Sequence, residues 1–138
     1  MNLSDARTAV IQALGRMKSL YNQPVFDEWV LVKLASEAGA VLAYDGPSAD
    51  SYQAKFKSDI APLQAEMEAR KMAVGDFEFV HGADGTHFDA CIRLGPASYL
   101  FCNHTTKTMD EIRQDRLWLE AQKPFAELSA KFRSDPLG

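Results

Sequence analysis

The segment from residue 76 to residue 104 restricts the fold most narrowly, because strand-like runs follow one another there with only tight turns between them. The runs are Asp76–His81, Thr86–Leu94 and Ser98–His104, and short glycine-containing turns join them. Connections this short can join only antiparallel neighbours, since parallel strands need a long crossover. We therefore predict an antiparallel meander over this segment.

The middle run of the meander shows which of its faces is buried. Its apolar positions are Phe88, Ala90, Ile92 and Leu94, and they alternate with His87, Asp89, Cys91 and Arg93. Successive side chains of a strand point to opposite faces, so the alternation predicts one strongly apolar face.

A helix and a hairpin are predicted before the meander. Apolar residues recur at three-to-four spacing from Ser4, the expected cap, to Tyr21. Two runs rich in branched apolar residues follow, Glu28–Ala35 and Ala40–Tyr44, with a short turn between them. A second helical stripe extends from about Ser48 to Met72, and Pro62 inside it predicts a kink.

The closing segment is predicted to be a short helix joined to a longer, bent one. Thr108 and Glu111 form a capping box at its start, and Pro124 is an expected point of irregularity. The apolar stripe of this segment comprises Ile112, Trp118, Ala121, Phe125, Leu128 and Phe132. The tail from Ser134 to Gly138 is expected to fray.

Composition limits the classes of protein that this chain can belong to. With 138 residues, 46% of them hydrophobic, the chain can bury a core without disulfides or metal, and we expect residues 1–138 to be a single domain. A net charge of -4 disfavours binding to nucleic acid or to an anionic membrane. The start lacks the pattern of a secretory signal and no long apolar stretch is present, which predicts a cytoplasmic protein.

The order helix, strand, strand, helix, three strands, helix predicts an α+β fold: a five-stranded antiparallel sheet with helices on both faces. The order and spacing of these elements resemble the profilin-like architecture of the roadblock family. Three segments carry the resemblance, namely the hairpin from Trp29 to Tyr44, the helix from about Ser48 to Met72, and the meander from Asp76 to His104.

The resemblance implies a small non-enzymatic module that forms a homodimer and acts as a scaffold or regulator of a signalling protein. Pairing would use the middle helix and the third strand, so the implied interface residues are Phe56, Asp76, Phe77, Glu78 and Phe79. A second interpretation is that Phe77 and Phe79 are core residues, while Asp76 and Glu78 only protect a free sheet edge.

The sequence contains potential metal ligands near the meander, but their spacing fits no known metal motif. They are His81, His87, Cys91, Cys102 and His104. No Cys-x-x-Cys pair and no His pair at helical spacing occurs, so we expect no metal and no cofactor. Hydrolysis by His87 or His104 with Asp89 and a nucleophile, Cys102 or Thr105, lacks any supporting motif.

A ligand pocket is the alternative to an interaction module. Short hydrogen-bonding side chains are dense between Asn103 and Thr108, and a capped helix start adds amides suited to an anion. The residues that would line this pocket are His87, Asn103, His104, Thr105 and Thr106. The same side chains could simply satisfy the backbone of a turn. An interaction module is thus the first hypothesis, a small-molecule or anion sensor the second, and an enzyme the third.

Overall fold

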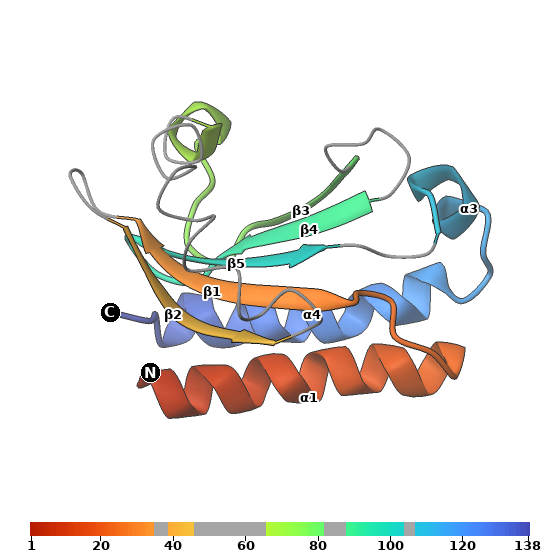
Figure 1. Ribbon diagram of the computed structural model, residues 1–138, viewed down its shortest axis with the longest axis horizontal. Helices are drawn as coiled ribbons and strands as arrows, with labels where there is room; N and C mark the ends of the chain where they lie inside the picture. The colour runs from red at the N-terminus through yellow and green to blue at the C-terminus, as the bar shows by residue number, and fades with distance from the viewer. Residues whose placement is uncertain (35–38, 46–65, 82–87, 104–106) are drawn as a thin grey trace.

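The computed structural model describes residues 1–34, 39–45, 66–81, 88–103 and 107–138 (Figure 1). The helices and strands, in chain order, are α1 (Leu3–Tyr21), β1 (Glu28–Leu34), β2 (Gly39–Asp45), β3 (Phe77–His81), β4 (Phe88–Arg93), β5 (Ser98–Asn103), α3 (Met109–Arg113) and α4 (Trp118–Ser134). Residues 66–70 are also helical. Most of the predicted middle helix, including Phe56 and Pro62, lies outside the described residues.

The five strands form one antiparallel sheet in the order β2-β1-β5-β4-β3. The predicted hairpin and meander are confirmed, and β1 pairs with β5 to join them into one sheet. This arrangement places β3 at one edge of the sheet and β2 at the other.

One face of the sheet packs against α1 and α4, which lie side by side along it (Figure 1). The strands contribute the predicted alternate residues, such as Phe88, Ala90, Ile92 and Leu94 from the segment of β4. The predicted stripes of both helices are buried in the same core. Trp29 and Trp118 are buried in the same core. Because tryptophan buries a large apolar area, these two side chains anchor the sheet to the closing helices, as predicted.

The opposite face of the sheet carries a second, smaller core. Val30, Val32, Cys91 and Tyr99 pack there with Met67, which lies in the helical residues 66–70, and with Met72. Helices on both faces of a five-stranded antiparallel sheet are the predicted α+β architecture. We refer to the face beneath residues 66–72 as the methionine face and to the other as the α1/α4 face.

Arg93 fastens the chain at the margin of the methionine face. Its guanidinium donates hydrogen bonds to the carbonyls of Met72 at 2.6 Å, Pro96 at 2.6 Å and Gly95 at 3.2 Å. It also lies 5.8 Å from the centre of the Tyr99 ring. One side chain thereby holds the backbone that precedes β3 against the turn between β4 and β5.

The helix starts differ in part from the prediction. Asn2, not Ser4, caps α1, because its side-chain oxygen accepts the N–H of Asp5 at 2.8 Å. The cap of α3 is the predicted one, since the Thr108 hydroxyl accepts the N–H of Glu111 at 3.2 Å. The break in the closing segment falls between α3 and α4, and α4 continues through Pro124.

The prediction that the C-terminal tail frays is wrong. Leu137 is 5% exposed, and its N–H bonds to the carbonyl of Leu94 at 3.0 Å. The hydroxyl of Ser98 donates to the carbonyl of Gly138 at 3.3 Å. The tail approaches Gly95 so closely that a Cβ there would lie 1.8 Å from the carbonyl oxygen of Leu137. Apolar burial and hydrogen bonding to the β4–β5 turn therefore order a segment with no helical or strand signal.

Candidate functional site

The outer edge of β3 is the first candidate for a functional surface. The backbone carbonyl of Asp76 accepts a hydrogen bond from the N–H of Arg93 at 3.0 Å. The register then pairs Glu78 with Cys91 and Val80 with Asp89. Because hydrogen-bonded positions alternate along an antiparallel pair, the N–H and C=O groups of Phe77, Phe79 and His81 point away from β4. No other strand of the described residues pairs with this side of β3. The edge therefore presents a row of backbone donors and acceptors.

The rings of Phe77 and Phe79 lie on the α1/α4 face, beside α4. The centroid of Phe79 is 4.9 Å from that of Trp118 and 5.4 Å from that of Phe125, both in edge-on geometry. Phe77 lies 6.2 Å from Phe125 and 5.5 Å from Phe79. Both rings are only half-buried, so the predicted interface residues touch the core and still leave apolar area at the sheet edge.

Asp76 closes the turn that leads into β3. Its carboxylate accepts the N–H of Ala73 at 2.9 Å and a hydrogen bond from Arg133 at 3.0 Å, and these two interactions hold the pKa of Asp76 below its ordinary value. Gly75 lies inside this turn with φ of 89°, and a Cβ there would meet the Arg133 side chain at 2.2 Å. Asp76, one of the predicted interface residues, therefore stabilises the turn that precedes β3.

Glu78 lies on the methionine face and is held by an arginine. Arg70 makes an ion pair with Glu78 and another, at 2.7 Å, with Glu66. These two carboxylates raise the pKa of the Arg70 guanidinium above its ordinary value, with hydrogen bonding to Glu66 as the largest cause. The helical residues 66–70 are thereby tied to the edge strand, and the charge of Glu78 is neutralised beside the edge.

The other sheet edge, β2, is less regular than β3. The register of β2 with β1 shifts between Leu31 and Val32, where β2 contains one extra residue. Such a bulge twists a strand and interrupts the even spacing of its outward hydrogen-bonding groups. Proteins commonly use bulges to keep an edge from pairing. Of the two edges, β3 is therefore the better suited to accept another strand.

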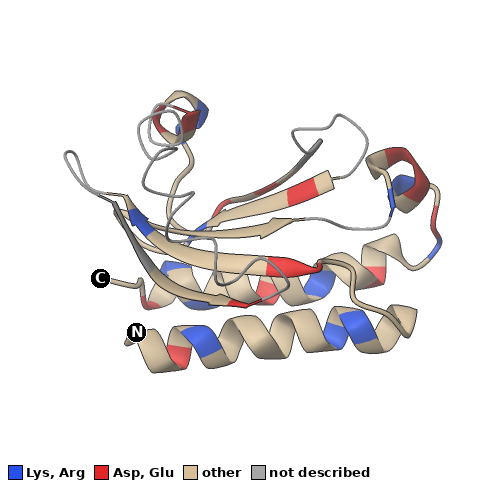
Figure 2. Cartoon of the chain, in the orientation of Figure 1, with Lys and Arg blue, Asp and Glu red and all other residues tan. Residues whose placement is uncertain are grey.

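The described part of the predicted ligand pocket is acidic. Asn103 pairs with Glu28 across β5 and β1, and the register of β5 with β4 brings Asp89 level with Asn103 on the other side. Figure 2 shows acidic positions at this same end of β1 and β4. Glu28 is 3% exposed, and each of the three residues interacts with other parts of the chain. These three residues thus form one polar row across β1, β5 and β4 at the described part of the predicted pocket.

The remaining residues of that pocket lie outside the described residues, namely His87, His104, Thr105 and Thr106. The groups that follow them are used within the fold. The ammonium of Lys107 lies 3.7 Å from the carboxylate of Asp115 and 5.2 Å from the centre of the Tyr21 ring. Thr108 caps α3, and Asp110 and Glu111 place negative charge in its first turn.

The two thiols point to opposite faces of the sheet. Cys91 lies in the core of the methionine face, where its thiol contacts the Met67 sulfur at 3.5 Å, and Cys102 lies in the core of the α1/α4 face. Burial raises the pKa of Cys91 to about 12 and that of Cys102 well above its ordinary value. They therefore cannot ligate one metal ion together. Cys102 lies on the face opposite Asp89, which excludes Cys102 as the nucleophile beside Asp89, whereas Thr105, the other nucleophile considered, lies outside the described residues.

No set of three or more His, Cys, Asp or Glu side chains within the described ranges is placed to hold a metal ion. The positions of His87 and His104, and the side chain of His81, are outside what the structure describes. Among the helices of those ranges, none combines the length and the apolar character needed to cross a bilayer.

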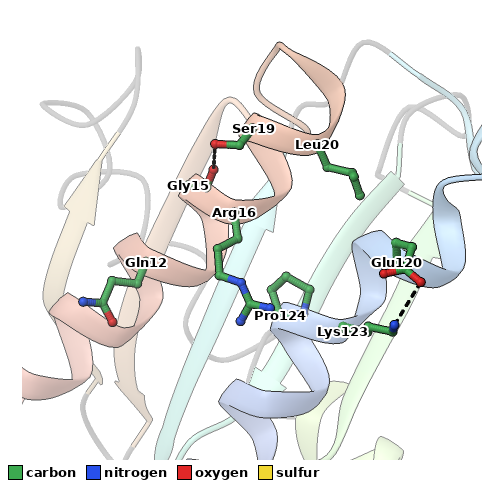
Figure 3. Close-up of a pocket in the computed structure, with 8 residues that line it drawn as sticks. All are labelled: Gln12, Gly15, Arg16, Ser19, Leu20, Glu120, Lys123 and Pro124. Atoms are coloured by element: carbon green, nitrogen blue, oxygen red, sulfur yellow. Dashed lines mark hydrogen bonds and ion pairs between the residues drawn. The ribbon is translucent and has the colours of Figure 1, made fainter.

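A shallow hollow of about 860 Å³ lies along the seam of α1 and α4 (Figure 3). Most of its charged and hydroxyl side chains already have partners: Lys123 binds Glu120 at 2.9 Å, the hydroxyl of Ser19 donates to the carbonyl of Gly15 at 3.0 Å, and Arg16 pairs with Glu127. A ligand here would have to compete with these contacts, so we do not regard the hollow as a site.

Comparison with known proteins gives likeness only at the level of the fold. No family model matches the chain, and no curated protein matches it. A solved structure of MglB with a tetrameric arrangement is 16% identical, with a TM-score of 0.44, and the match covers 91% of this chain and 90% of that one. The GAF domain of a putative sensor histidine kinase from Pseudomonas syringae pv. tomato is 12% identical, with a TM-score of 0.33, and the match covers 96% of this chain and 95% of that one. The architecture assigned above rests on the strand order, and neither likeness carries an argument about function.

Sequence reasoning missed two features of these surfaces. The first is the ion pair of Arg70 with Glu78. In the sequence Arg70 stands four residues after Glu66 on a predicted helix, a spacing that indicates only an ordinary surface ion pair. The second is the burial of Glu28 at the start of β1. In the sequence Glu28 is simply an acidic residue that precedes a strongly apolar strand. Neither signal identifies the partner that lies far away in sequence.

Proposed function

We propose that this protein is a non-enzymatic interaction module that forms a homodimer by pairing the β3 edge of two copies. The observation that carries the proposal is the outer edge of β3, with its outward backbone groups and its half-buried Phe77 and Phe79. A dimer of this kind would present one continuous sheet and two copies of each helical surface. Such a paired surface suits a scaffold or a regulator that binds a third protein.

The physical basis is strand addition. A strand that joins a sheet edge gains main-chain hydrogen bonds, while neighbouring apolar side chains gain buried area. Phe77 and Phe79 supply that area on the α1/α4 face, and the neutralised Glu78 lowers the electrostatic cost on the methionine face. The regular β3 satisfies these conditions better than the bulged β2.

The two other functions considered receive less support from the described residues. Most residues considered for an anion site lie outside the described residues, and Asn103, the described one, already interacts with other parts of the chain. A thiol enzyme would need a reactive cysteine, whereas burial keeps both thiols protonated at neutral pH. We therefore retain the interaction module as the proposed function.

The proposal is tested by measuring the solution mass by sedimentation velocity over a wide range of protein concentration. We expect the wild-type chain to form a dimer and the His81→Pro variant to be monomeric, because proline removes an N–H that points outward from the edge. Leu119→Asp is the matched control, since Leu119 is 77% exposed on α4 and should leave the dimer intact. A wild-type chain that stays monomeric at every concentration overturns the proposal.

Amide hydrogen exchange gives a second test that needs no variant. The N–H groups of Phe77 and Phe79 should be protected at concentrations where the dimer forms and should exchange rapidly on dilution. The N–H of Tyr44, which points outward from β2, should exchange at a rate that does not depend on concentration. Equal behaviour of Phe79 and Tyr44 at all concentrations would contradict pairing through β3.

A further inference from the structure

A groove of about 340 Å³ lies between α1 and strands β1 and β2, at the end of the sheet opposite β3. Its floor is formed by apolar side chains that are each less than a tenth exposed, namely Met17, Val25, Phe26 and Trp29. On α1, Ile11 is 48% exposed and Leu14 is half-buried beside this floor. The groove therefore offers apolar area that the fold leaves accessible.

Two acidic side chains from different parts of the chain line the same groove. Asp45 ends β2 and pairs with Trp29 of β1, so both side chains lie on the α1/α4 face. Asp27 precedes β1, and its N–H bonds to the carbonyl of Asn103 at 3.1 Å. Both residues are exposed, and among the described residues neither carboxylate has a hydrogen-bond or ion-pair partner. A cation can therefore bind them without displacing a contact of the fold.

The charge of the groove is negative. Lys18 is the basic residue among its described lining residues, and it lies in the last turn of α1, where the helix dipole favours a positive charge. One ammonium faces the two carboxylates of Asp27 and Asp45. Electrostatic complementarity therefore selects a positively charged partner.

Gly15 on α1 adjoins the groove, although no described contact of the fold requires a glycine there. It lies in the interior of the helix, and a Cβ built on it would have no described atom within 4 Å. Alanine would strengthen the helix, because glycine loses more backbone freedom on folding. Gly15 also lines the hollow at the α1/α4 seam (Figure 3), so α1 carries no side chain at the point that the two depressions share. Another chain can approach the helix closely at this point.

The form of the groove favours a segment of another protein over a small molecule. Sites for small ligands enclose most of the ligand, in volumes of about 300–1,000 Å³. This groove lies at the lower end of that range, and its margin is formed by exposed residues such as Ile11, Lys18 and Asp45. It can enclose one side of a chain and accept a few anchoring side chains.

We infer that the groove between α1 and strands β1 and β2 binds a segment of another protein that carries an arginine or lysine close to an apolar residue. The basic side chain pairs with Asp27 and Asp45, and the apolar residue packs against Ile11 and Leu14. This inference rests on the proposed function only in taking another protein as the partner, because the groove and the proposed dimer interface lie at opposite ends of the sheet.

Selection from a random peptide library displayed on phage, with the full chain immobilised, tests the recognition chemistry. We expect the recovered peptides to carry arginine or lysine close to a large apolar residue. One of them is then synthesised with a fluorescent label, and its Kd is measured by anisotropy. Absence of enrichment, or enrichment of acidic peptides, overturns the inference.

Conservative variants locate the binding on the chain. We expect Asp27→Asn, Asp45→Asn and Ile11→Gln each to raise the Kd of the peptide about tenfold, through loss of a charged or an apolar contact. Glu68→Gln and Leu119→Gln are the matched controls, since they replace exposed residues that do not line the groove. An unchanged Kd in the three groove variants, or an equal loss in the controls, overturns the inference.

The sign of the charge effect is tested at Lys18. We expect Lys18→Gln to lower the Kd about two- to threefold, because it removes the charge that opposes the basic side chain. Added salt should raise the Kd of the wild-type chain. Weaker binding by Lys18→Gln contradicts the proposed charge complementarity.

Gly15→Ala separates binding from stability. We expect its Tm to rise by about 2–6 °C, because alanine favours the helix and its Cβ meets no described atom. The Kd of the peptide should rise about fivefold, since the methyl group occupies the point of close approach. A Kd equal to that of the wild type contradicts close approach to α1.

Other occupants of the groove give different results. Tighter binding of phenethylamine than of every selected peptide identifies a small organic cation and overturns the inference. A change in solution mass on Ile11→Gln identifies a second copy on this face and also overturns it. His81→Pro, at the opposite end of the sheet, should bind the peptide with the wild-type Kd. A monomeric wild-type chain that binds the peptide overturns only the proposed dimer, whereas a dimer that binds no basic peptide overturns only the inference about the groove.

Discussion

The ring of Phe79 meets the indole of Trp118 edge-on, with centroids 4.9 Å apart and planes at 66°. This contact joins the edge strand β3 to the first turn of α4, two elements separated by much of the meander. The strand that carries the proposed interface is therefore anchored in the core through its own side chain. We expect substitution of this phenylalanine to change folding as well as the proposed association, so the two effects must be measured separately.

We predict that Phe79→Ala lowers the free energy of unfolding by about 2–3 kcal/mol, less than the roughly 3–5 kcal/mol typical of fully buried phenylalanine, because the ring is half-buried. Urea denaturation at one low protein concentration measures this change without a contribution from dimerisation. Leu119→Ala should change stability by less than about 0.5 kcal/mol, since Leu119 is 77% exposed. Equal losses in the two variants would show that Phe79 does not anchor β3.

Gly95 and the C-terminal tail should be energetically coupled. We expect Gly95→Ala to destabilise the full chain by about 1–3 kcal/mol, because its Cβ would lie 1.8 Å from the carbonyl oxygen of Leu137. Removal of residues 136–138 should also destabilise, by about 1.5–3 kcal/mol, through loss of the buried Leu137 side chain.

The decisive measurement for this pair is the double variant. In the truncated chain Gly95→Ala should cost less than about 0.5 kcal/mol, because the atom it clashes with is gone. Thermal unfolding of all four chains completes the cycle. Strictly additive effects would mean that the tail does not pack on Gly95.

Both thiols should be unreactive in the folded chain. Burial raises the pKa of Cys91 to about 12 and that of Cys102 well above its ordinary value, so almost no thiolate is present at pH 8. A chromogenic disulfide reagent at pH 8 should titrate both cysteines in denaturant and neither without it. Rapid reaction of one thiol per folded chain would contradict the burial described for these residues.

Asp76 should contribute to the pH dependence of stability. Its pKa is lowered in the folded chain by the N–H of Ala73 and by the Arg133 guanidinium. The stabilisation is therefore present above the pKa of the unfolded chain, near pH 4, and is lost as the pH falls through the lower, folded value. Asp76→Asn removes that titration, so the wild type should exceed the variant in stability at pH 6 and the difference should shrink by pH 2–3.

Urea midpoints measured between pH 2 and pH 7 test this expectation. Glu68→Gln is the control, because Glu68 is exposed on the helical residues 66–70, and its profile should follow that of the wild type. A difference between Asp76→Asn and the wild type that does not change with pH would show that the carboxylate charge of Asp76 is unimportant to the turn.

The ligand hypotheses show why side-chain clusters are harder to predict than strands. Cys91 and Cys102 are both in the meander, yet the registers put them on opposite faces of the sheet. Asn103 was predicted to line a ligand pocket, and the registers of β1 and β4 place Glu28 and Asp89 on either side of it. The exact β4–β5 register and the β1–β5 pairing decide these neighbours, and the local pattern leaves both open.

Features with local signals could be predicted from the amino-acid sequence: the alternation of Phe88 to Leu94, the tight turns of the meander, the helical stripes and the Thr108 cap. The pairing of β1 with β5, which makes β3 an edge strand, is visible only in the folded chain. The same holds for the contact of Arg70 with Glu78 and for the packing of Leu137 on Gly95. Periodicity and turn chemistry act over a few residues, whereas strand order and tail docking depend on apolar burial shared between segments far apart in the chain.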